Sequence, residues 1–263
     1  WASSHSGTII HSSDAGNSWV LQNSGITTPL HSIYFINNQV GWAAGNGGVI
    51  LKTTDGGNNW IPQNSQTTRW LFSIYFLDEN SGWAAGSYST VIKTTNGGTN
   101  WQALTIPGIQ FIEGIYFVND NVGWLAGGSS GQYGIILKTT DGGDSWITQY
   151  DSDSSDFNSV YFKNENDGLV IGRYGQIWST TNGGNTWILQ DDFIYNELFS
   201  IAHCETSELW ISGSYGTILH SVDGGIPVEL TSFSSSINDN DVTLNWKTAT
   251  ETNNQGFQID RLK

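Results

Sequence analysis

Short acidic or amide side chains at a regular spacing are the first candidates for chemistry in this sequence. They are separated by 41, 41, 45, 41 and 41 residues. Carboxylates at a fixed spacing could transfer protons or bind Ca²⁺. The positions are Asp14, Asp55, Asn96, Asp141, Asn182 and Asp223.

The surrounding motif favours a structural role over catalysis. Each copy reads S/T-x-D/N-x-G, and five copies end in a tryptophan: Trp19, Trp60, Trp101, Trp146 and Trp187. Two copies carry Asn, and an amide neither exchanges protons nor binds a hard cation well. We therefore predict a turn in which the Asx oxygen accepts backbone N–H groups two residues on. The glycine then supplies a positive φ and the indole packs on its surroundings.

Other constellations point less clearly to chemistry. Asp151, Asp153 and Asp156 could ligate Ca²⁺, but their Ser-rich stretch is more typical of a solvated loop and lacks the rest of a known Ca²⁺ pattern. His11 and His220 occupy a strand position that other repeats fill with Lys. Cys204, the only cysteine, excludes an intrachain disulfide and is expected to be a small buried hydrophobe. We expect no metal and no cofactor.

Composition restricts the partners. Nine basic residues stand against 24 acidic ones, giving a net charge of −15, which disfavours nucleic acid and anionic membrane surfaces. No apolar run is long enough to span a bilayer, so we expect no membrane insertion. With 32 Gly and 13 Trp, the chain is typical of an all-β protein with many turns.

The 41-residue period predicts a propeller. One unit contains four strand-like runs, at 30–37, 41–45, 48–54 and 59–63, and no helical period is present. We predict an all-β fold: a β-propeller of six four-stranded blades over 1–225, with seven blades as the alternative, followed by an incomplete β-sandwich over 226–263. The chain opens inside a repeat, so we expect a fragment in which an upstream segment supplies the outer strand of the last blade.

These repeats carry a family resemblance. The motif resembles the Asp-box, or BNR repeat, of sialidases, xyloglucanases and sortilin-type propellers. The longer unit GWAAG…GVILKTTDGGNNW is more similar to propellers resembling photosystem II assembly factors. Residues 226–263 resemble the start of a fibronectin type III-like domain in proteins secreted by the type IX pathway. The resemblance implies a secreted or cell-surface location.

Topology predicts where a site would lie. The Asp-box turns should share one face with the turns between first and second strands, and the opposite face should collect the second-to-third turns and the blade connections. That opposite face gathers aromatic and Arg side chains, the residue types that recognition surfaces use. The alternative is that the tyrosines pack between blades. The candidates are Arg69, Trp70, Tyr88, Tyr133, Arg173, Tyr174 and Tyr215, with Phe111 nearby.

We therefore expect a non-catalytic, monomeric binding or adhesion module that recognises glycan or protein. The alternative is a glycoside hydrolase. Sialidase-like propellers hold a carboxylate with three arginines, and the repeats here contain only Arg69 and Arg173. A third option, assisting assembly of a membrane complex, rests on the resemblance alone.

Overall fold

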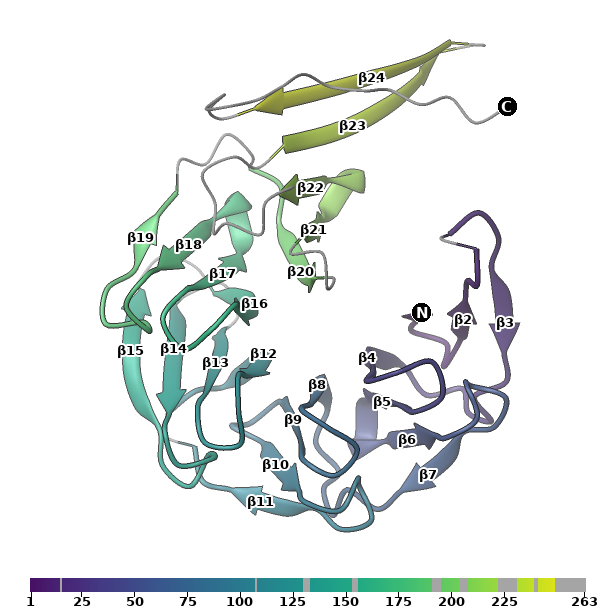
Figure 1. The fold of residues 1–263 in the computed structure, drawn as a ribbon, viewed down its shortest axis with the longest axis vertical. Helices are drawn as coiled ribbons and strands as arrows, with labels where there is room; N and C mark the ends of the chain where they lie inside the picture. The colour runs from purple at the N-terminus through teal and green to yellow at the C-terminus, as the bar shows by residue number, and fades with distance from the viewer. Residues whose placement is uncertain are drawn as a thin grey trace.

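The chain forms an all-β propeller of six blades arranged around a common centre (Figure 1). The computed structural model describes residues 1–14, 16–106, 108–129, 133–152, 156–190, 195–203, 208–221, 231–238 and 241–248. Each sheet is an antiparallel meander whose strands follow chain order outward from the centre. The predicted fold class is confirmed, with six blades. Within the described residues, no helix is long and apolar enough to cross a membrane.

The strand bounds follow the predicted repeat closely. Blade 1 contains β1 (Ala2–Ser3), β2 (Ile9–His11) and β3 (Val20–Gln22). Blade 2 contains β4 (Leu30–Phe35), β5 (Gly41–Gly45), β6 (Ile50–Thr53) and β7 (Ile61–Gln63). Blade 3 contains β8 (Leu71–Phe76), β9 (Gly82–Gly86), β10 (Val91–Thr94) and β11 (Gln102–Leu104).

The later blades repeat this order. Blade 4 contains β12 (Phe111–Phe117), β13 (Gly123–Gly128), β14 (Gly134–Thr139) and β15 (Ile147–Ser152). Blade 5 contains β16 (Phe157–Phe162), β17 (Gly168–Gly172), β18 (Ile177–Thr180) and β19 (Ile188–Leu189). Blade 6 contains β20 (Leu198–His203), β21 (Leu209–Gly213), β22 (Ile218–Ser221), β23 (Thr231–Asn238) and β24 (Asp241–Thr248). Single 3₁₀ turns, η1 (Asn46–Gly48), η2 (Arg173–Gly175) and η3 (Ser214–Gly216), join second to third strands.

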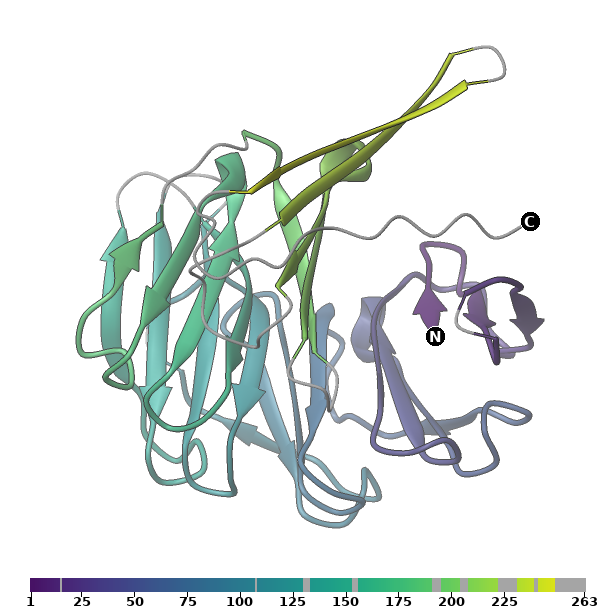
Figure 2. The ribbon, with the colours of Figure 1, turned by 45° about the horizontal axis from the view of Figure 1, so that its top comes forward.

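The outer strand of blade 6 comes from the C-terminal segment. β23 pairs with β22 in the register that β7 uses on β6, with His220 opposite Thr231 as Lys52 is opposite Ile61. It therefore occupies the place for which we expected an upstream strand. β24 then adds to β23, and this hairpin extends beyond the blades (Figure 2). The fibronectin type III-like assignment of 226–263 stays a prediction.

Neighbouring blades are joined by a repeated stack of Lys, Trp and Phe. Trp83 on β9 stacks on Phe117 of the next blade with ring centroids 3.7 Å apart. Lys93 lies over the Trp83 ring at 5.4 Å. Both Trp83 Nε1 and Lys93 Nζ donate to the Gly142 carbonyl in the next Asp-box turn, at 3.3 and 3.1 Å. Trp42 on Phe76 and Trp124 on Phe162 repeat the ring contact.

A glycine is required beside each stacked Phe. A Cβ added to Gly123 would lie 2.5 Å from the Phe117 ring, which is fully buried. In blade 6 the equivalent residues are Leu209 and His203, so the glycine and the Phe are absent together. The preceding blade has Leu169 and Ser179 where blades 2 to 4 have Trp and Lys. The seam between blades 5 and 6 therefore lacks the stack.

The Asp-box turn is held by two side-chain acceptors. Thr53 Oγ1 accepts the Gly57 N–H at 2.9 Å, and Asp55 Oδ1 accepts the Asn59 N–H at 2.9 Å. The Asx oxygen thus reaches four residues on, whereas two were predicted, because the intervening glycines fold the chain back. The amide oxygen of Asn96 makes the same bond to Asn100 at 2.9 Å. Asp223 lies outside the described residues.

The box tryptophans differ between the first blade and the rest. Trp60, Trp101, Trp146 and Trp187 are buried and meet a Phe of their own blade edge-on, as Trp146 meets Phe117 at 84°. Trp19 instead leaves 49% of its surface exposed. Blade 1 begins with its second strand in the described structure, so it offers no first-strand Phe for Trp19 to pack against.

Candidate functional site

Backbone hydrogen bonds place the two groups of turns on opposite faces. The second-to-third turns lie against the blade connections, as shown by Ser87 N–H donating to Trp70 O at 2.9 Å and Ser214 N–H donating to Glu197 O at 2.8 Å. The Asp-box turns lie against the first-to-second turns, as shown by Gly56 N–H donating to Gln39 O at 2.9 Å. We call the face formed by the second-to-third turns and the blade connections the tyrosine face.

Exposed aromatic side chains concentrate on the tyrosine face. Of the eight large aromatic residues that are exposed in the described chain, five lie there, and Phe199 lies in β20 close to the connection that precedes it. Tyr215 is 94% exposed, Tyr88 64% and Tyr174 55%, so these three do not pack between blades. The five are Trp70, Tyr88, Tyr174, Tyr195 and Tyr215.

The three exposed tyrosines sit on strained backbone. Tyr88, Tyr174 and Tyr215 have φ of 56°, 57° and 56°. Blade 2 has Gly47 in the equivalent turn, with φ of 68°. A residue with a Cβ pays about 1–2 kcal/mol in this left-handed region, whereas glycine does not. The chain therefore keeps bulky residues where the backbone alone would favour glycine, and such strain clusters at functional sites.

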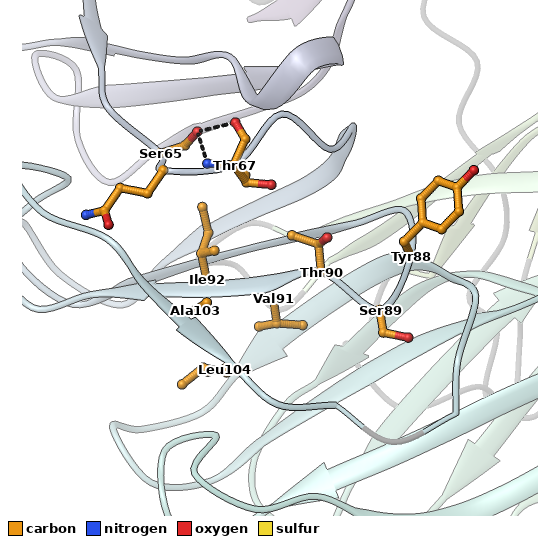
Figure 3. A pocket seen from close by; sticks show the side chains of 10 residues that line it. Ser65, Thr67, Tyr88, Ser89, Thr90, Val91, Ile92, Ala103 and Leu104 are labelled. Carbon is orange, nitrogen blue, oxygen red and sulfur yellow. Dashed lines mark hydrogen bonds between the residues drawn. The ribbon is translucent and has the colours of Figure 1, made fainter.

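Over blades 2 and 3, an arginine and a tyrosine form one group. The Arg69 guanidinium lies 4.3 Å above the centre of the Tyr88 ring. Within the described structure Arg69 forms no ion pair. Trp70 projects beside His31, with ring centroids 6.5 Å apart. Tyr88 also stands at one end of a groove of about 310 Å³ between the two blades (Figure 3).

Over blades 4 to 6, the second arginine is already engaged. Arg173 Nε lies 2.9 Å from Asp156 Oδ1 and 3.4 Å from Glu197 Oε1. Glu113 stands nearby on β12. Burial raises its pKa to about 7; the carboxylates of Asp156 and Glu197 also raise it and Arg173 lowers it. Two carboxylates thus share one guanidinium, and Arg173 is not free to bind a ligand carboxylate.

The other predicted residues are more dispersed. Tyr133 is half-buried in a turn closed by Ser129 N–H donating to Tyr133 O at 3.1 Å. Phe111 is half-buried beside Phe72. Asp151 is exposed on β15, whereas Asp153 and Cys204 lie outside the described residues. His11 and His220 stack on Trp1 and Trp210 at 4.0 and 3.8 Å, so they fill the Lys position of the blade-to-blade stack. Within the described part, no group of three His, Cys, Asp or Glu could hold a metal ion.

Three features of this face were missed from the sequence. Tyr195 and Phe199 are exposed beside the tyrosine turns but lie in a connection and a first strand, where no repeat signal marked them. The groove between blades 2 and 3 was also missed. Its signal is a break in the repeat, because Ala103 and Leu104 replace larger or polar residues in the other fourth strands.

Comparison with known proteins identifies the family. The model of the family described as photosynthesis system II assembly factor YCF48 matches residues 53–150 and 99–191, which together span more than half of the chain. The chain belongs to this family. No curated protein matches it.

Solved YCF48 structures share the fold. One, described as YCF48 bound to D1 peptide, is 22% identical with a TM-score of 0.63. The match covers 85% of this chain and 74% of the YCF48 chain. YCF48 from Cyanidioschyzon merolae is 16% identical with a TM-score of 0.54, covering 84% and 90%. An ancestral GH74 enzyme is 21% identical with a TM-score of 0.57, and the match covers 84% of this chain but 31% of the enzyme. These identities establish a shared fold only.

Proposed function

We propose that this YCF48-family chain is a non-catalytic binding module that recognises a polypeptide through the tyrosine face. The observation that carries the proposal is the gathering of five exposed aromatic side chains on one face, three of them on strained backbone. Exposed Tyr and Trp combine apolar area with hydrogen-bonding groups and few rotatable bonds, so ordering them on a partner costs little entropy.

A polypeptide is favoured over a glycan for two reasons. The YCF48 relative is described with a D1 peptide bound. In addition, the groove on this face is at the small end of the range for ligand sites, about 310 Å³, which suits one side chain of a longer segment.

A hydrolase role is disfavoured by the arginines. Arg173 is ion-paired with Asp156 and Glu197, and Arg69 lies over Tyr88 in another part of the ring. A sialidase-like site would need several guanidinium groups converging on one substrate carboxylate. We expect no turnover of fluorogenic sialosides or β-glucans by the purified chain, and measurable turnover lost on Arg173→Ala would refute a non-catalytic module.

The binding experiment pairs a random octapeptide phage library with a glycan array. We expect peptides to be recovered on the wild-type chain and to bind at least tenfold more weakly to the combined Tyr174→Gly and Tyr215→Gly variant. Trp19→Ala is the matched control, because it removes an exposed aromatic from the opposite face. Glycan binding without peptide binding, or peptide binding that the tyrosine variant leaves unchanged, would overturn the proposal.

Two further parts of the proposal concern the state of the protein. We propose that it is secreted or displayed at the cell surface, supported by the resemblance of residues 226–263, and fractionation of the native host tests this. We also propose a monomer, which light scattering behind a sizing column tests.

A further inference from the structure

The groove between blades 2 and 3 is built from two chain segments that face each other. One wall is Ser65, Gln66 and Thr67 in the connection that leaves β7. The other wall and the floor come from the second-to-third turn of blade 3 and from β10 and β11: Tyr88, Ser89, Thr90, Val91, Ile92, Ala103 and Leu104 (Figure 3). The groove therefore opens beside Tyr88 on the tyrosine face.

A departure from the repeat accompanies the groove. The position of Ala103 is Leu21, Pro62, Thr148 or Leu189 in blades 1, 2, 4 and 5, so blade 3 carries the smallest side chain of these five blades there. The next position is Gln in all four of those blades, but Leu104 in blade 3. The floor is thus both more open and more apolar than the repeat would make it, which suits an apolar side chain.

The walls hold most of the strained residues of the chain. Five non-glycine residues have positive φ in the described structure, and three line this groove: Gln66, Tyr88 and Ser89. Gln66 Nε2 donates to Trp101 O at 3.0 Å, and the Tyr88 N–H donates to Gln110 O at 2.7 Å. The surrounding structure therefore fixes a conformation that the local backbone disfavours, as is usual for ligand clamps.

Charge distinguishes this half of the face from the other. The connections and turns over blades 1 to 3 contain no Asp or Glu, although the chain has 24 acidic residues. These segments are 3–8, 23–29, 45–49, 64–70, 86–90 and 105–110. They do contain Arg69. The half over blades 4 to 6 carries Asp156 and Glu197, whose two negative charges exceed the one positive charge of their partner Arg173. An acidic residue of a bound segment is therefore repelled from blades 4 to 6 and attracted to Arg69.

Arg69 has no competing ion pair in the part of the chain that the structure describes. Its guanidinium carbon lies 4.3 Å from the centre of the Tyr88 ring, and a guanidinium that contacts an aromatic ring can still donate N–H groups to a carboxylate. We propose that the groove takes one aliphatic or aromatic side chain of the bound polypeptide, and that Arg69 binds the carboxylate of an Asp or Glu next to it. This inference rests on the proposed function, because it names the anchoring subsite of the same face.

The test uses the octapeptides recovered from the random library, synthesised with a fluorescent label. We expect them to share an acidic residue adjacent to an aliphatic or aromatic one. Replacing the acid by its amide should weaken binding to wild type at least tenfold. The same replacement in the peptide should not change its binding to the Arg69→Gln variant, because the change in the peptide and the change in the protein remove the same contact. Lys163→Gln, which removes one charge in a first-to-second turn on the opposite face, should behave like wild type.

Filling the groove gives an independent arm. Ala103→Leu adopts the residue of two other blades and should fold normally, which thermal melting checks, yet weaken peptide binding at least tenfold. Thr148→Leu is the matched control at the same position in blade 4, and should have no effect. Binding unchanged by Ala103→Leu, or recovered peptides without the acidic residue, would refute the subsite. If the Tyr174 and Tyr215 variant still abolishes binding in that case, the proposed function stands; if no peptide is recovered at all, the proposed function fails.

Discussion

Replacing Tyr215 by glycine should leave the chain as stable as wild type or slightly more stable. The ring is 94% exposed and the backbone has φ of 56°. In the equivalent turn of blade 2, Gly47 adopts nearly the same conformation, so a glycine at this position needs no rearrangement. The substitution therefore separates the cost of the backbone conformation from the value of the ring.

The expected magnitude follows from three contributions. Removing the Cβ relieves about 1–2 kcal/mol of left-handed strain. Glycine in turn costs about 0.5–1 kcal/mol of unfolded-chain entropy. The hidden part of the ring, roughly 15 Å², is worth only about 0.4 kcal/mol at ~25 cal/mol/Å². The midpoints sum to a stabilisation of about 0.3 kcal/mol, whereas Tyr215→Ala keeps the strain and should be slightly destabilised.

Urea unfolding of wild type, Tyr215→Gly and Tyr215→Ala measures these differences. We expect equal m-values, with the glycine variant about 1 kcal/mol more stable than the alanine variant, or about 2–4 °C in melting temperature. A ring wedged between blades would instead cost about 3–5 kcal/mol on removal. A loss of that size in both variants, or equal stability of the two, would show that the reasoning about strain and exposure is wrong.

Three further predictions concern the blades and the charged groups. Gly123→Ala should destabilise by about 3 kcal/mol, measured by urea unfolding, because the new Cβ meets the buried Phe117 ring at 2.5 Å. Hydrogen bonds from the side chain of Ser145, which has the larger effect, and from its backbone N–H lower the pKa of Asp141 to about 2. Wild type therefore loses stability as pH falls from about 4 to 2, and Asp141→Asn should lose less over that range. Burial raises the pKa of Glu113 from 4.5 to about 7, so stability falls as pH rises through that interval. Glu113→Gln should be more stable than wild type above pH 7, by about 3 kcal/mol, and similar below pH 4, as pH-dependent melting would show.

The fold was accessible from the sequence because local chemistry repeats with the blades. Box residues such as Thr53 and Asp55 bond within one turn, so a short motif carries its own structure. The same topology placed the tyrosine turns on the face away from the boxes. We predicted that the Asx side chain accepts an N–H two residues on, whereas Asp55 accepts the N–H of Asn59, four residues on. The sequence does not show how far the glycines fold the chain back.

The candidate site was less accessible, because it depends on contacts between distant segments. Arg173 and Arg69 look alike in the sequence, yet among the residues that the structure describes only Arg173 contacts carboxylates, from residues 17 and 24 positions away along the chain. The positive φ of Tyr88 contradicts local propensity, and no residue pattern predicts it. The groove depends on Ala103 facing a connection that belongs to the preceding blade.

The pairing of Gly123 with Phe117 has a consequence for how such repeats diverge. At four blades a new side chain in place of the glycine would collide with the ring of the adjacent Phe. Blade 6, with Leu209 and His203, shows that both can change together. The substitutions therefore have an obligatory order: the aromatic is exchanged first, and only then can the glycine be exchanged. The order in which the repeated blades of this protein can accept these two substitutions is therefore determined by one van der Waals contact, between the glycine position and the Phe ring.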